Sequence, residues 1–223
     1  MFNLPWDFTV IPLYFPRFFQ AAFLTLQLTT LGIVLGLFLG LVTSLMRISK
    51  SKALNVPAKM YIWLIRGTPL LLQLFIIYYG LAPILNIPSF PSAFMALGIH
   101  NGAYIAEIFR GSIVSIDRGQ TEAALSLGMT PWQAMKRIIL PQAFKRSVPP
   151  LGNQFIIALK DSSLASTITV RELLLRSRQI GSSTFLTMEM LTIAAVYYLI
   201  MTSVLTLMVG KVEERLKISE YRS

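Results

Sequence analysis

Three long stretches without a charged side chain constrain this sequence most. They cover residues 18–46, 67–106 and 190–210, which is 29, 40 and 21 residues. A helix that crosses a bilayer needs about 20 apolar residues. In lipid only helices and closed barrels satisfy their own backbone, and these stretches are too long for barrel strands. We therefore expect an all-α integral membrane protein.

The composition agrees with a membrane location and argues against other classes. Hydrophobic residues make up 54% of the chain, charged residues 13%, and the mean hydropathy is +0.63. The net charge of +10 does not require nucleic acid, because basic residues in short cytoplasmic loops beside anionic lipid heads account for it. The chain has no cysteine and one histidine, His100. We therefore expect the lipid membrane as a partner and no metal site.

The uncharged stretches and the segments between them can hold five spans. We place these spans at about 18–46, 57–82, 91–115, 147–164 and 186–210. The fourth is the least apolar, because Pro149, Pro150, Gly152 and the pair Lys160–Asp161 interrupt it. We treat 1–223 as a single transmembrane domain.

Basic residues orient these spans. Four belong to the first connection, six to the third and four to the tail, whereas the second connection, around 81–91, has none. They are Arg47, Lys50, Lys52 and Lys59; Arg110, Arg118, Lys136, Arg137, Lys145 and Arg146; and Lys211, Arg215, Lys217 and Arg222. The positive-inside rule then predicts the N-terminus outside and the C-terminus in the cytoplasm. Arg171, Arg176 and Arg178 fall on the outer side, which a re-entrant segment, an outer vestibule or a partner contact would explain.

Glycine and proline predict local features of the first two spans. Gly32, Gly36 and Gly40 recur every four residues, which permits close packing against another helix, and we expect that helix to belong to the same chain. Gly67 and Pro69 weaken the second span, because Pro69 has no N–H to donate. Broken helices in transporters often lie beside a substrate pathway.

A motif of fixed spacing lies between the third and fourth spans. It reads EAA-x3-G-x9-I-x-L-P and comprises Glu122, Ala123, Ala124, Gly128, Ile138, Leu140 and Pro141. Seven fixed residues would match by chance roughly once in 10^8 start positions. The residues before Gly128 favour a helix that this glycine can close, and 130–133 can form a capping box for a second helix. We expect a helix, a turn and a second helix over about 117–141, ending at Pro141.

This motif resembles the EAA loop of the membrane-spanning subunit of bacterial ABC importers, on which an ATPase subunit docks. Other stretches are similar to polar amino-acid permeases of the histidine, glutamine and arginine uptake group: Arg66 to Leu71 with Gln73, Ala106 to Gly111 with Gly119 and Gln120, and Asn153 with Leu159 to Leu164. The resemblance covers about 25–209. It implies a five-helix permease of the type I importer kind, multi-pass in the bacterial inner membrane.

The resemblance also implies partners. These are ABC ATPase subunits, a second permease subunit that is identical or homologous, and an extracellular or periplasmic amino-acid-binding protein. The sequence has no G-x4-G-K-[ST] phosphate-binding loop. We therefore expect no cofactor and no enzymatic activity on this chain, with ATP and Mg²⁺ held by the ATPase.

Polar side chains at membrane depth are the candidates for substrate contact, because a charge there costs about 2.5–3.5 kcal/mol and usually faces protein, water or a ligand. Asp161 has three open roles: substrate contact, a pair with Lys160 or a buried arginine, or a helix cap. Glu107 lies three residues before Arg110, so a structural ion pair is the first expectation and substrate contact the second. His100 has a pathway role and a packing role open. The full set is Asp161, Ser162, Ser163, Glu107, Thr68, Gln73, Asn153 and His100.

The functional hypothesis is ATP-driven import of polar L-amino acids by alternating access, with a cationic substrate such as arginine, lysine or histidine preferred. Two alternatives stay open. The first is an ion-coupled secondary transporter or channel subunit without an ATPase, which predicts an internal repeat that we do not detect. The second is a structural membrane scaffold, which leaves the buried acids unexplained.

Overall fold

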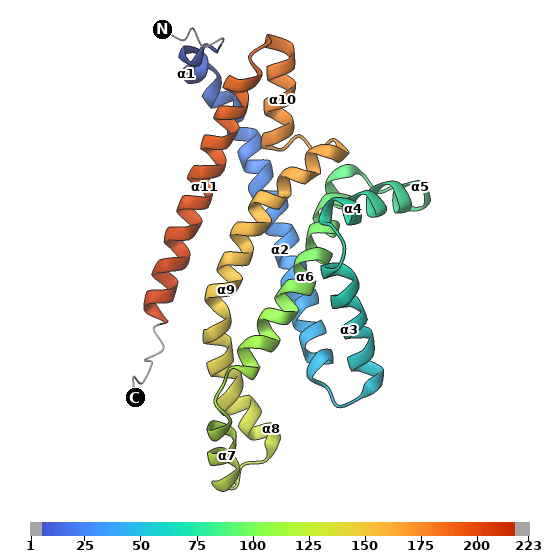
Figure 1. Ribbon diagram of the computed structural model, residues 1–223, viewed down its shortest axis with the longest axis vertical. Helices are drawn as coiled ribbons and strands as arrows, with labels where there is room; N and C mark the ends of the chain where they lie inside the picture. The colour runs from blue at the N-terminus through green and yellow to red at the C-terminus, as the bar shows by residue number, and fades with distance from the viewer. Residues whose placement is uncertain (1–5, 217–223) are drawn as a thin grey trace.

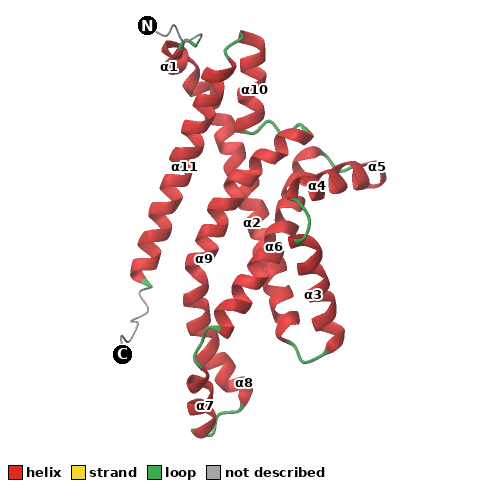
Figure 2. Ribbon diagram, viewed as in Figure 1, coloured by secondary structure: helices red, strands yellow, loops and turns green. Residues whose placement is uncertain are grey.

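The computed structural model describes residues 6–216, and their regular structure is entirely helical (Figure 2). The α-helices are α1 (Ile11–Tyr14), α2 (Phe19–Ile48), α3 (Lys52–Arg66), α4 (Leu70–Phe75), α5 (Ala82–Leu85), α6 (Ser89–Val114), α7 (Arg118–Ser126), α8 (Pro131–Ala134), α9 (Leu140–Asp161), α10 (Leu173–Thr184) and α11 (Thr187–Arg215). Short 3₁₀ segments cover Phe8–Val10, Phe15–Phe18 and Ser162–Ile168, and π segments cover Ile76–Leu81 and Met135–Ile139.

The long helices α2, α6, α9 and α11 run along the length of the molecule, with α3 beside the lower half of α2 (Figure 1). The helices α7 and α8 form the lower tip, and the α2–α3 connection and the last turn of α11 lie toward the same end. The short helices α1 and α10 lie at the opposite end. The basic residues of the first and third connections therefore gather at one end of the bundle. Lys217 and Arg222 of the predicted tail lie outside the described residues.

Two of the predicted spans are confirmed as long apolar helices. Phe8–Ile48 and Thr187–Arg215 are each long and apolar enough to cross a membrane, and a third candidate exists if the bent pair α3 and α4 counts as one span. The helix α6 coincides with the third predicted range and α9 overlaps the fourth, but both are less apolar. Because α6 packs against α2, α3, α4 and α9 in the interior, it carries small and polar residues rather than lipid-facing ones. The count of five spans stays a prediction.

The second predicted span, 57–82, is wrong as a continuous helix. It consists of α3 and the segment Leu70–Leu81, which meet at an angle of 105°. The break lies at Gly67–Pro69, where the sequence already predicted weakness. Pro69 lacks an N–H and adopts an extended conformation with ψ of 138°, so the chain turns there before α4 begins.

The predicted start of the fourth span at 147 and the predicted end of the loop at Pro141 are also wrong. The helix α9 begins at Leu140, continues through Pro141, Pro149 and Pro150, and ends at Asp161. Pro141 is tolerated because the π segment before it shifts the hydrogen-bond register, and it occupies the first turn of α9. The helix α9, which includes the later prolines, packs against α6 and α11.

The glycine ridge packs inside the chain, as predicted. A Cβ added to Gly32 would lie 2.9 Å from the Cβ of Leu97, and one added to Gly40 would lie 2.8 Å from the Cβ of Ile105. On the facing helix, a Cβ on Gly98 would lie 2.8 Å from the Cβ of Leu35. We call this contact between α2 and α6 the α2–α6 seam. It brings the two backbones close enough that no side chain fits between them at these positions.

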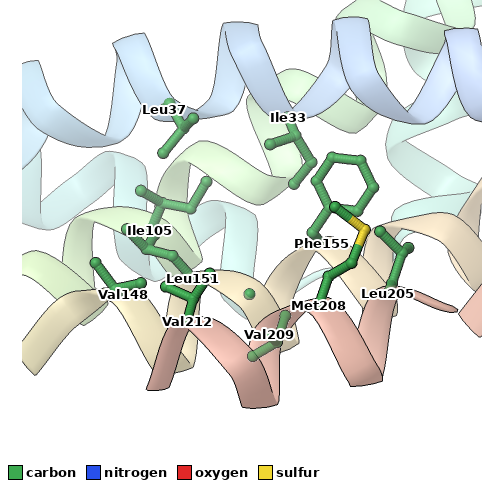
Figure 3. Close-up of a pocket in the computed structure, with 11 residues that line it drawn as sticks. Ile33, Leu37, Ile105, Val148, Leu151, Phe155, Leu205, Met208, Val209 and Val212 are labelled. Atoms are coloured by element: carbon green, nitrogen blue, oxygen red, sulfur yellow. The ribbon is translucent and has the colours of Figure 1, made fainter. Parts of the chain in front are cut away.

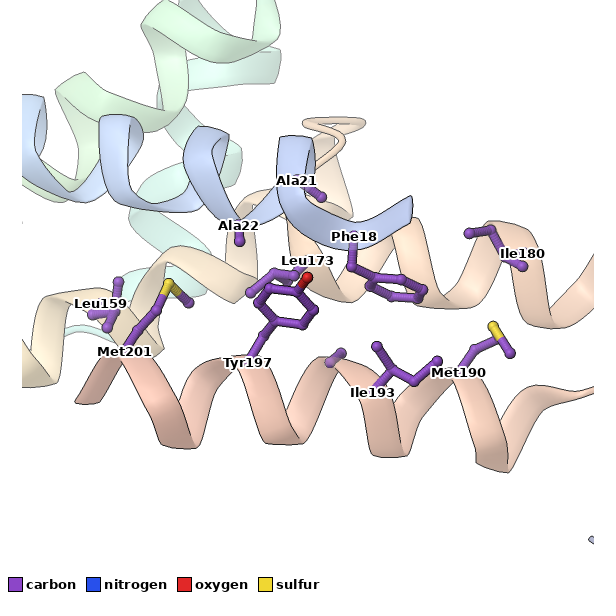
Figure 4. Close-up of a cluster of buried hydrophobic side chains, with 11 residues drawn as sticks. Phe18, Ala21, Ala22, Leu159, Leu173, Ile180, Met190, Ile193, Tyr197 and Met201 are labelled. Atoms are coloured by element: carbon purple, nitrogen blue, oxygen red, sulfur yellow. The ribbon is translucent and has the colours of Figure 1, made fainter. Parts of the chain in front are cut away.

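A hydrophobic cluster closes the end of the bundle that carries α1 and α10 (Figure 4). Phe18 is fully buried between the start of α2 and α11, and its ring lies 6.3 Å from that of Tyr197. The Tyr197 hydroxyl donates to the carbonyl of Phe15 at 3.0 Å. Met190 and Ile193 fill the same cluster from α11, so the two most apolar helices are joined at this end.

Candidate functional site

The motif loop forms the predicted helix, turn and second helix. Asp117 caps α7 by accepting from the Gly119 amide at 2.6 Å. The helix then ends in a Schellman arrangement, in which the Met129 amide donates to Ala124 O at 3.1 Å and the Gly128 amide to Leu125 O at 2.9 Å. Gly128 has φ of +81°, the left-handed conformation that a residue without a Cβ adopts at low cost.

The capping box at the start of α8 is confirmed. The Thr130 hydroxyl accepts from the Gln133 amide at 3.3 Å, and the Gln133 side chain accepts from the Thr130 amide at 2.9 Å. Pro131 occupies the first turn, where its missing N–H is not needed. The loop therefore holds its shape through local hydrogen bonds.

The loop is anchored to the bundle by one face and exposes the other. Ile139 is buried with Ile116 and Ala143, and half-buried Ile138 packs against this cluster. On the outer face Leu127 is 81% exposed and Trp132 is 69% exposed. The other motif residues divide between the two faces: Ala124 is buried, Leu140 is half-buried, and Glu122, Ala123, Gly128 and Pro141 are exposed. An apolar surface on a loop outside the bundle is typical of a protein interface.

Two side chains of α9 brace the loop against the end of α6. Arg146 donates to the backbone carbonyl of Ser115 and lies 3.2 Å from its hydroxyl. Gln142 donates to the Gln120 side chain at 3.3 Å and to Ile138 O at 3.0 Å. The loop and α9 are therefore tied together as one piece.

Three of the predicted substrate candidates meet at the break between α3 and α4. The Gln73 Nε2 donates to Ile65 O at 2.7 Å and lies 3.0 Å from Thr68 O and 2.9 Å from Thr68 Oγ1. Its Oε1 lies 3.1 Å from His100 Nδ1. Gln73 thus satisfies carbonyl groups that the bend releases, and it links the break to α6.

His100 is packed in the interior in this conformation, and its pathway role stays a prediction. It is buried, bonded to Gln73, and its ring lies 5.0 Å from that of Tyr104. The Arg66 guanidinium in turn lies 5.1 Å from the Tyr104 ring centroid, a cation–π contact. A polar column therefore runs from the exposed Arg66 to the buried Gln73.

A second polar contact in the interior was missed from the sequence. The Gln154 Nε2 donates to Asn101 Oδ1 at 2.8 Å, and both residues are buried between α6 and α9. Asn101 also donates to Leu97 O at 2.7 Å. The neighbouring candidate Asn153 is exposed, about 100° around α9 from Gln154. Gln154 could have been chosen over Asn153 only by knowing which face of α9 is turned to the interior. The sequence alone does not give that face.

The acidic candidates separate into two environments. Glu107 forms the expected ion pair with Arg110 at 2.8 Å, and Arg47 lies 4.0 Å away. Asp161 is half-buried at the end of α9 and has no hydrogen-bond or ion-pair partner among residues 6–216. The pair with Lys160 and the helix cap are therefore not formed. Ser162 and Ser163 donate back to Leu159 O and Lys160 O, both at 2.7 Å.

Glu172 is a buried acid that the sequence analysis did not single out. Its carboxylate caps α10, accepting from the amides of Leu174 and Leu175 at 2.9 and 2.8 Å and from the Tyr198 hydroxyl at 2.8 Å. Burial raises the pKa of this carboxyl, against the opposing effect of these hydrogen bonds. An acidic residue directly before an apolar helical run is an N-cap signal that would have found it.

The groove between α2, α6, α9 and α11 does not suit a polar substrate. It has a volume of about 340 Å³ and is lined by apolar residues, among them Phe155 and Met208 (Figure 3). A polar solute would lose its hydrogen bonds there without replacement. The polar column at the helix break and the free carboxylate of Asp161 are the chemically suited positions.

Comparison with known proteins places the chain in a family. Residues 32–218 match the binding-protein-dependent transport system inner membrane component family. The L-cystine transport system permease protein TcyB of Bacillus subtilis is 42% identical over 96% of this chain and 92% of its own length. The glutamine transport system permease protein GlnP of Escherichia coli is 42% identical over 74% of this chain and 76% of its own. The arginine transport system permease protein ArtQ of Bacillus subtilis is 36% identical over 95% and 97%.

Solved structures agree in fold. The crystal structure of an amino acid ABC transporter with histidines contains a chain that is 41% identical, with a TM-score of 0.91, over 95% of this chain and all of that one. An inward-facing methionine ABC transporter, MetNI, shares only the fold, at 17% identity and a TM-score of 0.69 over 87% of this chain and 95% of that one. TcyB and GlnP are both named as permease proteins of transport systems. This chain therefore belongs to the inner membrane components of binding-protein-dependent transport systems, among the permeases of amino-acid ABC transporters.

Proposed function

We propose that this chain is the membrane-spanning subunit of an importer that moves polar L-amino acids into the cytoplasm by alternating access, driven by a separate ATPase. The exposed apolar face of the motif loop carries this proposal. Glu122, Ala123, Ala124, Gly128, Ile138, Leu140 and Pro141 form a coupling loop, whose ATPase partner covers Leu127 and Trp132. ATP and Mg²⁺ are bound by that partner, and this chain holds no cofactor.

The proposed topology has five spans, with the N-terminus outside, the C-terminus in the cytoplasm and residues 1–223 as one domain. The gathering of basic connections at the end that carries the coupling loop supports it (Figure 1). Further partners are a second permease subunit, identical or homologous, and an extracellular amino-acid-binding protein. The membrane is the bacterial inner membrane.

We propose a cationic amino acid as the preferred substrate. Asp161 supports this preference because it is a half-buried carboxylate without a partner in the described residues, and an opposite charge would stabilise it best. Glu107 no longer supports it, since Arg110 already neutralises that carboxylate. The relatives TcyB, GlnP and ArtQ are named for cystine, glutamine and arginine.

ATPase docking is tested by truncating the exposed face of the loop. The amount of ATPase that co-purifies with the double variant Leu127→Ala, Trp132→Ala should be at least ten-fold lower than with the wild type. Burying each of these side chains contributes about 1.5–3 kcal/mol to binding. Leu199→Ala is the matched control, since Leu199 is 66% exposed on α11 but lies outside the loop. Equal ATPase retention by all three proteins would remove the docking assignment.

Transport in proteoliposomes separates this function from an ion-coupled transporter. Uptake should require the ATPase, the binding protein and ATP, and an ion gradient alone should drive none. The variant Asp161→Asn keeps the size of the side chain and should lower uptake of arginine or lysine several-fold more than uptake of glutamine. Gradient-driven uptake without the ATPase would favour the alternative, and equal effects on all three substrates would remove the cationic preference alone.

A further inference from the structure

A basic pocket lies at the end of the bundle that carries α1 and α10. Its volume is about 390 Å³. It lies between the start of α2 and the start of α10, and is lined by Arg17, Gln20, Ala21, Phe23, Leu24, Gln27, Arg171 and Arg176. Three guanidinium groups therefore converge from two distant segments, on the side where the positive-inside rule predicts few basic residues.

No acidic side chain neutralises these three arginines within residues 6–216. The ion pairs of this part of the chain join Glu107 to Arg110 and to Arg47. Glu172 follows Arg171 in sequence, but its carboxylate is fully buried and bonded to α10 amides and to Tyr198. The Glu172 carboxylate thereby also caps the N-terminus of α10, so the free amides at this helix end are already bonded. The charge that faces the pocket is positive and uncompensated, which favours an anionic ligand.

The pocket lies at the level of lipid headgroups. Arg17 and Arg47 flank the uncharged stretch of 29 residues. At 1.5 Å per residue they are about 45 Å apart along the helix, which matches the roughly 40–45 Å of a bilayer with its headgroup regions. With Arg47 at the cytoplasmic surface, Arg17 lies at the outer headgroups.

The pocket combines a polar wall with an apolar one. The polar wall includes Arg17 and, one turn later, the side-chain amide of Gln20. The Arg17 guanidinium lies over the Tyr14 ring, 4.8 Å from its centroid. On the same helix Phe23 is 63% exposed beside Leu24. A phosphodiester fits the arginines, because guanidinium groups bind phosphate through two parallel hydrogen bonds. The glycerol and the first acyl carbons of the same molecule would contact Phe23.

We propose that this pocket binds an anionic phospholipid of the outer leaflet, with the phosphate held by Arg17, Arg171 and Arg176. A free carboxylate or phosphate would use the charge but leave the apolar wall uncovered. The site is separate from the proposed substrate position at Asp161. It places a lipid between α2 and α10, at the end of the bundle where the Phe18 cluster joins α2 to α11.

Lipid retention by the purified permease–ATPase complex tests this site. The complex is taken from nanodiscs of equal phosphatidylglycerol and phosphatidylcholine, and bound lipid is counted by native mass spectrometry. Wild type should retain phosphatidylglycerol over phosphatidylcholine. The triple variant Arg17→Gln, Arg171→Gln, Arg176→Gln should lose that preference at least five-fold. Arg178→Gln, at an exposed arginine of α10 outside the pocket lining, should keep it.

Several outcomes would overturn the site. One is unchanged phosphatidylglycerol retention by the triple variant, and another is release of the lipid by millimolar inorganic phosphate, which would indicate a free-anion site. A third is unchanged lipid retention with weaker docking of the binding protein, which would assign the arginines to that partner. Should the triple variant fail to assemble, Arg176→Gln alone should show a two- to three-fold loss. ATP-driven uptake is measured on the same samples, so failure of the lipid site and failure of the proposed function are distinguishable.

Discussion

The α2–α6 seam and the coupling loop both depend on glycine, but for opposite reasons. A Cβ on Gly40 would lie 2.6 Å from Ile105 Cγ2, although the backbone there is an ordinary helix. A Cβ on Gly128 would meet nothing within 4 Å, although φ there is +81°. Space is limiting in the seam and conformation is limiting in the loop. The seam is complete within this chain, whereas the loop exposes an apolar face that needs a partner.

The largest effect is expected in the seam. Gly40→Ala should lower the free energy of unfolding by about 2–3 kcal/mol, because the new methyl group meets the Cβ of Ile105 and the Ala106 amide nitrogen, which cannot rotate away. Thermal unfolding of the purified protein measures this change. Gly111→Ala is the matched control on α6, since a Cβ there has open space, and it should be neutral or slightly stabilising. The same melting temperature for both variants would contradict the distinction drawn for the seam.

The next effect is expected at the turn of the loop. Gly128→Asp should abolish transport and uncouple ATP hydrolysis while the protein still inserts in the membrane. The left-handed backbone costs a side chain about 1 kcal/mol, and the charge adds a penalty at the interface. Gly128→Asn is the control, because asparagine tolerates this conformation and adds no charge. Normal coupled transport by the aspartate variant at normal expression would show that the loop does not transmit the ATPase motion.

A smaller effect is expected from the cap of α8. Thr130→Ala removes the hydroxyl that accepts from the Gln133 amide, which costs about 1 kcal/mol of local helix stability. ATPase affinity should fall roughly five-fold, with the global melting temperature unchanged, because the loop is separate from the packed bundle. Thr130→Ser, which keeps the hydroxyl, should restore the affinity. A drop in melting temperature as large as that of Gly40→Ala would mean that the loop contributes to the core.

The smallest effect is expected for the polar contact beside the seam. A double-mutant cycle of Asn101→Leu and Gln154→Leu should give a coupling energy of about 0.6 kcal/mol, typical of hydrogen bonds between helices in membranes. Thermal unfolding of the two single variants and the double variant measures it. A coupling above about 2 kcal/mol would show that this bond, rather than close packing at the glycines, sets the stability of the interior.

Features that depend on neighbouring residues could be predicted from the sequence. The left-handed Gly128, the capping box of Thr130 and Gln133, and the ion pair of Glu107 and Arg110 each involve residues at most three positions apart. The glycine ridge was also predictable, because its four-residue spacing places small residues on one helical face.

Features that depend on distant contacts or irregular hydrogen bonds could not be predicted from the sequence. The 105° bend needs Gln73 to satisfy carbonyl groups across the break, and α9 continues through Pro141 because a π segment precedes it. The cap formed by Glu172 is a local signal, but its hydrogen bond from Tyr198 comes from another helix. At the bend and in α9, a long-range or irregular hydrogen bond overrides the local preference of the sequence.

The continuity of the coupling loop with α9 has a mechanical consequence. Gln142 ties α7 of the loop to this helix, Arg146 ties the helix to the end of α6, and the helix runs for 22 residues, or about 33 Å, to Asp161. Such a rod acts as a lever: a tilt of about 10° at the loop would displace its far end by roughly 6 Å. The π segment Met135–Ile139 joins the loop directly to this helix, and Pro149 and Pro150 each remove one backbone hydrogen bond farther along it. Under the proposed function, a movement of the ATPase at the loop would reach the charged end of α9 through continuous helix.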